Sequence, residues 1–240
     1  MNSHRFRSRT RRSRTRRLRA LRSRTLAAAF LAGILLAVLV TGCGSSGTSG
    51  QRGNGLVHLD DLPGAAGVRG VALQQPLGKP DIRLTGTDGR PYDFRAATAS
   101  RLTLLFFGYT HCPDICPTTM ADIAAALSTL PPADRAQVSV VFVTSDPQRD
   151  TPAALGSWLA QFDPSFVGLT GPFETVAGYA EQLGVTLERP QRQPDGSVTV
   201  SHGTQVTAFS PNGTARVAYL AGTKVADYVH DIPLLIAGRT

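Results

Sequence analysis

The stretch that decides the fold is LTLLFFGYTHCPDICP, residues Leu102 to Pro117. Its first part, Leu102 to Phe107, is nearly continuous apolar sequence, which is typical of a central strand buried on both faces. Its second part carries Cys112 and Cys116 between that strand and the next helix. Open α/β sheets place their sites at the C-terminal ends of such strands. Because helix N-terminal amides favour thiolates, the pair is predicted to exchange disulfides, reduce a peroxide or bind a soft metal.

A short structural disulfide between these two cysteines is the simplest alternative in an oxidising compartment. A stapling disulfide stabilises a protein most when it closes a long loop, and the loop between Cys112 and Cys116 is tiny. The spacing therefore favours a functional pair over a structural one.

The segments around this stretch alternate between the periods of strands and helices. Strands are expected as a hairpin over Ile82–Phe94, a second central strand over Val138–Thr144 and a hairpin over Thr204–Leu220. Helices are expected from near Pro117 to before Pro131, from about Pro152, around Phe173–Ala180, and at the C-terminus, where Pro233 interrupts or ends the last one. This order predicts an α/β chain with a thioredoxin-like fold, an N-terminal β-hairpin and a mixed central sheet flanked by helices.

The basic charge of the chain is concentrated at one end. The 240 residues carry 25 Lys and Arg against 17 Asp and Glu, a formal net charge of +8. Residues 1–42 hold eleven Arg and no acidic residue, so the rest of the chain has 14 basic residues against 17 acidic ones. Basic charge confined to one terminus excludes nucleic acid as the expected partner of the main domain.

The N-terminal segment has the layout of an export signal: an Arg-rich stretch, then the apolar run Leu26–Val40, then Gly42-Cys43. Fifteen apolar residues are short of the about 20 that a spanning helix needs. The order Val40-Thr41-Gly42-Cys43 resembles a bacterial lipobox, which implies lipid attachment to Cys43 and cleavage before it. An uncleaved signal anchor is the alternative. Both interpretations place the following domain outside the cytoplasm, and the pair Arg16-Arg17 leaves Sec and twin-Arg export open.

The amino-acid composition divides the chain into three regions. Residues 1–42 are expected to form a lipoprotein-type export signal, and residues 43–78 a lipid-anchored flexible tether with an irregular segment. Residues 79–240 contain no second break in composition, so they are expected to form one thioredoxin-like domain. The expected location is the outer face of the cytoplasmic membrane.

Three segments together resemble the Sco/SenC family of copper chaperones. They are FFGYTHCPDICPTTM from Phe106 to Met120, the DxxxD pattern of Asp146 and Asp150, and VSHGT from Val200 to Thr204. The similarity extends from about Lys79 to the C-terminus, and the order and spacing of the three segments make it specific.

The resemblance implies that Cys112, Cys116 and His202 bind copper. Two thiolates and one imidazole suit Cu(I), and the same groups hold Cu(II) when a water or oxygen ligand is added. Other histidines, at 58, 111 and 230, are better explained as ordinary polar residues. For Asp146 and Asp150 two interpretations stay open: they cap and solvate a helix start, or they recognise a partner, as the resemblance implies.

The favoured hypothesis from the sequence is a metallochaperone rather than an enzyme. The resemblance implies delivery of copper to the binuclear copper site of cytochrome c oxidase subunit II, with other copper carriers or thiol reductants as further partners. A thiol–disulfide oxidoreductase, acting on the cysteines of that subunit, and a thiol peroxidase are the alternatives. Redox enzymes of this fold usually carry CxxC and a cis-Pro before the facing strand, whereas this chain has CxxxC and His202-Gly203. No peroxide pocket is identifiable from the sequence.

Overall fold

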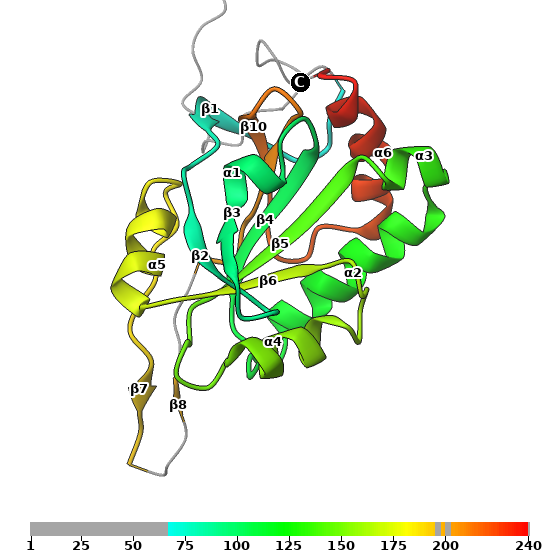
Figure 1. Ribbon diagram of the computed structural model, residues 1–240. Helices are drawn as coiled ribbons and strands as arrows, with labels where there is room; N and C mark the ends of the chain where they lie inside the picture. The colour runs from blue at the N-terminus through cyan, green and yellow to red at the C-terminus, as the bar shows by residue number, and fades with distance from the viewer. Residues whose placement is uncertain (1–66, 195–197, 200–202, 240) are drawn as a thin grey trace, which may run out of the picture. The chain divides into compact units, whose positions relative to one another are not determined.

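The computed structural model describes residues 67–194, 198–199 and 203–239 (Figure 1). The strands within these ranges are β1 Val71–Gly78, β2 Arg83–Gly86, β3 Pro91–Asp93, β4 Leu102–Gly108, β5 Val138–Thr144, β6 Val167–Thr170, β7 Gln191–Arg192, β8 Val198–Thr199, β9 Val206–Phe209 and β10 Thr214–Tyr219. The helices are α1 Phe94–Ala97, α2 Ile115–Thr129, α3 Pro132–Arg135, α4 Pro152–Leu159, α5 Phe173–Glu181 and α6 Val225–Ile236.

One mixed sheet organises the domain, with strands in the order β1-β10-β9-β4-β5-β6-β2-β3. β4, β5 and β6 are parallel to one another, and the flanking strands pair antiparallel. β4 and β5 are in register from Leu102 opposite Val138 to Gly108 opposite Thr144, so both strands end at the same level. The short strands β7 and β8 form a separate pair.

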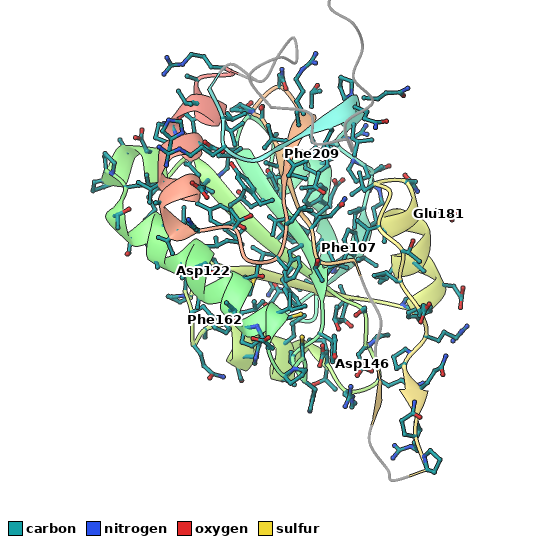
Figure 2. The ribbon with its side chains drawn as sticks, turned by 180° about the vertical axis from the view of Figure 1, so that it is seen from behind. Phe107, Asp122, Asp146, Phe162, Glu181 and Phe209 are labelled. Atoms are coloured by element: carbon teal, nitrogen blue, oxygen red, sulfur yellow. The ribbon has the colours of Figure 1, made fainter. Side chains whose placement is uncertain are left out.

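Helices cover both faces of the central strands. Leu104 and Phe106 of β4 pack with residues of α2, α4 and α6, whereas Leu105 and Phe107 pack with residues of α1 and α5. All seven residues of β4 are buried because both of its faces are covered. Figure 2 shows Phe107 inside the molecule, between the helix layer that carries Asp122 and the one that carries Glu181.

The expected thioredoxin-like architecture is confirmed, including both hairpins and the two central strands. α2 begins at Ile115, two residues before the expected start, because Pro117 fits the first turn, where backbone N–H groups have no partner within the helix. α6 continues through Pro233 to Ile236, so the proline lies in the last turn instead of ending the helix. β1 and β6 are additional strands that the periodicity did not reveal.

The sheet begins before the expected domain boundary at Lys79. β1 starts at Val71 and pairs with β10, with an irregularity in register between Ala72 and Leu77. The export signal, Cys43 and most of the expected tether lie outside the described residues, as does His202. No helix in the described ranges is both long enough and apolar enough to cross a membrane.

Candidate metal centre

The centre begins where β4 ends and the chain turns into α2; we call residues 108–114 the thiol loop. Ser145, directly after β5, donates from its N–H to the Gly108 carbonyl at 2.6 Å and from its hydroxyl at 3.1 Å. A Cβ on Gly108 would lie 2.7 Å from the Cys116 sulfur and 2.9 Å from the Phe142 ring. Glycine is therefore required here because the thiol and the ring both approach the backbone.

Cys112 and Cys116 are not joined by a disulfide, and they differ in exposure. Cys112 is partly exposed, whereas Cys116, in the first turn of α2, is fully buried. The Cys116 N–H donates to the Cys112 sulfur at 3.4 Å, within the range for a sulfur acceptor. An N–H at a helix start favours negative charge on the sulfur that it contacts. The structure thus brings the two predicted sulfur ligands together at the end of β4.

Burial dominates the chemistry of Cys116. Desolvation raises the pKa of its thiol well above the ordinary range, and the neighbouring Cys112 raises it further, while a hydrogen bond from the backbone of Tyr109 opposes the shift. A soft cation that binds this sulfur must displace its proton. The accessible sulfur of Cys112 can therefore react first and the buried sulfur of Cys116 second. The reaction can be with a soft metal, or it can form a disulfide.

Tyr109 is a site residue that the sequence reasoning missed. Its ring is buried, and burial together with hydrogen bonding to Cys112 raises the pKa of its phenol to about 12, against an opposing effect of Arg149. The phenol is therefore neutral at physiological pH and lies beside both sulfurs. Its position in the motif, between Gly108 and the cysteines, was the available signal.

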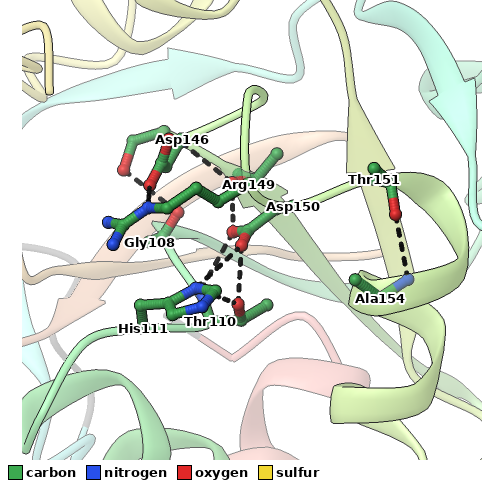
Figure 3. Close-up of polar contacts among 10 residues, drawn as sticks. Gly108, Thr110, His111, Asp146, Arg149, Asp150, Thr151 and Ala154 are labelled. Carbon is green, nitrogen blue, oxygen red and sulfur yellow. Dashed lines mark hydrogen bonds and ion pairs between the residues drawn. The ribbon is translucent and has the colours of Figure 1, made fainter.

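The acidic loop, residues 145–151, joins β5 to α4 and packs against the thiol loop (Figure 3). Asp150 is fully buried and accepts hydrogen bonds from the Thr110 N–H at 2.9 Å, the Thr110 hydroxyl at 2.6 Å and the Thr144 hydroxyl at 2.6 Å. Asp146 is also buried and forms an ion pair with Arg149. The side chain of Thr151 caps α4 by accepting from the Ala154 N–H at 3.3 Å.

These contacts correct the capping interpretation of the two aspartates. Neither carboxylate is solvated or provides the N-cap of α4, because Thr151 occupies that position. Recognition of a partner by Asp146 and Asp150 stays a prediction, and their side chains are 1% and 0% exposed. Asp150 joins the acidic loop to the thiol loop, whereas Asp146 pairs with Arg149 within its own loop.

His111 faces the acidic loop. Its Nδ1 lies 3.0 Å from the Thr110 hydroxyl and 3.6 Å from Asp150 Oδ1, and its side chain is half exposed. It therefore contributes a polar contact between the two loops. Asp114, at the end of the thiol loop, is exposed.

The third predicted ligand, His202, lies outside the described residues. Its ligation therefore stays a prediction from the sequence. Within residues 67–194, 198–199 and 203–239, no group of three His, Cys, Asp or Glu side chains is arranged to hold a metal. The chain just after His202 is described: the Gly203 N–H donates to Thr186 at 3.0 Å, and Val206 of β9 pairs with Phe106 of β4. The start of β9 thus lies at the same end of the sheet as the thiol loop.

A family model, a related sequence and a solved structure all point to the same protein family. The SCO1/SenC family model matches residues 72–237. A Stutzerimonas stutzeri protein named for copper binding is 32% identical over 157 residues, which are 65% of this chain and 76% of that protein. The structure of Bradyrhizobium japonicum ScoI with copper bound superposes with a TM-score of 0.59 at 29% identity, covering 67% of this chain and 99% of that one.

A more distant structure supports the fold alone. BsSco, described as a member of the Sco family of cytochrome c oxidase assembly proteins, superposes with a TM-score of 0.54 at 18% identity. The superposition covers 70% of this chain and 95% of that one.

Proposed function

The chain belongs to the SCO1/SenC family, and from that premise we propose that it is a copper chaperone that delivers copper to the binuclear site of cytochrome c oxidase subunit II. Copper is the cargo in this proposal, and a protein thiolate of the acceptor receives it. The observation that carries the proposal is the pairing of a partly exposed sulfur, Cys112, with a buried one, Cys116, at the end of β4.

The sulfur pair suits Cu(I) for two reasons. Thiolates are the soft ligands that select Cu(I) over harder cations. The partial exposure of Cys112 leaves one side of the site open to an incoming sulfur, which a carrier needs in order to release its metal. A site with four protein ligands has no open position, so it would retain the metal and not transfer it.

His202 is proposed as the third ligand. Its support is the sequence VSHGT and the placement of the described neighbours at the thiol end of the sheet. An imidazole added to two thiolates would accommodate Cu(II) as well as Cu(I).

Membrane attachment through a lipid on Cys43 completes the proposal and rests on the sequence alone. Acyl chains contribute about 0.8 kcal/mol for each buried CH₂, so a cysteine that carries two or three chains is held stably. The export signal, residues 1–42, and the tether that follows would place the domain on the outer face of the cytoplasmic membrane.

An anaerobic titration of the reduced protein with Cu(I) tests the proposal. We expect one copper per chain, a severe loss of affinity in Cys112→Ser and Cys116→Ser, and weaker binding with an altered Cu(II) spectrum in His202→Ala. Cys43→Ser is the matched control, because it removes a thiol outside the proposed site and should leave copper binding intact. Retention of copper by both Cys112→Ser and Cys116→Ser would refute the assignment, and an unchanged His202→Ala would restrict it to two sulfurs.

Thiol–disulfide exchange is the second candidate, because the two cysteines are adjacent, are not joined by a disulfide, and one of them is accessible. Transfer of Cu(I) to an apo oxidase copper domain, with little insulin reduction or peroxide consumption, is expected of the chaperone. Turnover comparable to a thioredoxin control without copper transfer would reverse the order of the two candidates.

A further inference from the structure

A buried carboxylate of the acidic loop contacts the thiol loop, and the proposed copper ligation does not use it. Asp150 comes after β5, but two of its hydrogen bonds reach Thr110, which lies just beyond the end of β4. A third comes from the Thr144 hydroxyl at the end of β5. One carboxylate therefore joins the ends of two neighbouring parallel strands. Figure 3 shows its contact with Thr110.

These contacts fix the backbone that carries Cys112. Thr110 is bound to Asp150 through both its N–H and its hydroxyl, and the Cys112 N–H donates to the Tyr109 carbonyl at 3.2 Å. The Cys112 sulfur then accepts from the Cys116 N–H at 3.4 Å. Asp150 thus holds the backbone at Thr110, two residues before the cysteine whose sulfur contacts Cys116.

Asp146 provides an internal comparison. It lies on the same loop and is buried to the same degree, but its carboxylate pairs with Arg149, a neighbour on that loop. Loss of either carboxylate removes one buried negative charge from the same region. An effect seen only at Asp150 would therefore come from the contacts that Asp150 makes and Asp146 does not, with Thr110 and Thr144.

We propose that Asp150 is a positioning residue for the copper site: by holding Thr110, it keeps the Cys112 sulfur beside Cys116. Buried polar networks in which every member is bonded restrict their neighbours to one arrangement. Two groups held in such an arrangement react as though at high local concentration. The inference rests on the proposed function only for the identity of the cargo, since the pairing of the thiols is a property of the copper-free protein.

The deciding experiment measures the equilibrium of the copper-free protein with glutathione. Two protein thiols are oxidised to one disulfide while one glutathione disulfide is reduced to two glutathione thiols, so atoms and electrons balance. We expect Asp150→Ala to lower this equilibrium constant about tenfold, the order expected for losing charge-assisted hydrogen bonds that hold one thiol. Asp146→Ala is the matched control and should stay within about twofold of the parent protein.

A conservative variant separates positioning from a general loss of stability. Asp150→Asn keeps one oxygen that can accept from the Thr110 N–H, so the constant should recover to within about threefold of the parent value. If Asp150→Ala does not fold, Thr110→Val carries the test, because it removes the 2.6 Å hydroxyl contact and should lower the constant about threefold. Thermal unfolding of each variant shows that the comparison is made on folded protein.

Equal constants in Asp150→Ala and the parent protein would overturn the proposal, as would equal losses in Asp150→Ala and Asp146→Ala. An increased constant would also overturn it. Competition for Cu(I) with a chelator is measured on the same variants. Failure of the parent protein to bind Cu(I) would overturn the proposed function, while the glutathione equilibrium would still decide the role of Asp150.

Discussion

At the residue scale, the close approach of the thiols depends on Gly108. The site of its missing Cβ lies 2.7 Å from the Cys116 sulfur and 2.9 Å from the Phe142 ring. Gly108→Ala should therefore destabilise the protein by about 1–3 kcal/mol, the usual cost of overpacking a core, and displace the buried sulfur. Urea unfolding measures the free energy, and the Cu(I) titration reports the displacement.

The control for this prediction is another glycine. Gly178 is exposed on α5, and a Cβ there would meet no atom within 4 Å. Gly178→Ala should stabilise the protein by about 0.5–1 kcal/mol, because alanine restricts the unfolded chain and favours helix. Destabilisation by both substitutions to the same extent would contradict the steric explanation.

At the element scale, α6 holds the first strand through one buried carboxylate. Asp231 accepts from the Arg69 N–H at 2.9 Å, the Gly70 N–H at 2.8 Å and the Tyr219 hydroxyl at 3.2 Å. Asp231→Ala should cost about 3 kcal/mol, because it leaves buried donors without an acceptor, and should increase amide hydrogen exchange in β1. Asp227→Asn, which loses only a partly exposed ion pair with Arg69, should change stability by less than about 1 kcal/mol. Equal effects of the two substitutions on stability would contradict the special role of the buried Asp231 carboxylate.

The strands show what a sequence pattern can reveal. β4 and β5 were predictable because both are apolar runs between turn signals, and β9 with β10 because they alternate around Asn212-Gly213. β1 was not, because it reads VALQQPLG, pairs on one side only and exposes most of its side chains. β6 was not either, because Gly168 interrupts the apolar pattern of its four residues, VGLT.

The candidate site likewise has residues that the sequence predicts and residues that it does not. Cys112 and Cys116 were predictable because cysteines at a strand–helix junction have few structural explanations. The burial of Asp150 was not, because its partner Thr110 lies 40 positions earlier and the two meet only when β4 and β5 align. Side chains that act through another loop are therefore visible only in the folded chain.

At the scale of the whole molecule, the two ends of the sheet differ in chemistry. The thiol loop and the acidic loop follow the C-terminal ends of β4 and β5, where the buried carboxylate of Asp150 contacts the thiol loop. Near the start of β4 lies a buried lysine, Lys79, whose ammonium donates to the Thr98 carbonyl at 2.9 Å and to the hydroxyls of Thr98 and Thr103 at 3.1 and 3.0 Å. All three donors of the ammonium are thus bonded, but to uncharged oxygens.

This lysine makes the stability of the domain depend on pH in a defined direction. Burial lowers the pKa of Lys79 to about 8 in the folded protein, below the usual value near 10.5 that applies in the unfolded chain. Between these values the unfolded chain binds more protons than the folded one, so stability rises with pH. The nearby Arg95 donates to the Lys79 carbonyl at 2.6 Å.

We therefore expect the free energy of unfolding of the parent protein, relative to Lys79→Met, to increase between pH 7 and about pH 10.5 by at most about 3 kcal/mol. Replacing Lys79 by Met removes the titrating group while keeping an unbranched chain of similar length in the same space. Urea unfolding of both proteins at matched ionic strength measures the difference at each pH. The exposed Lys224, changed to Met, controls for loss of one cation. A pH profile that falls, or one that Lys224→Met reproduces, would contradict burial of Lys79 as the cause, because only a desolvated ammonium gains stability by losing its proton.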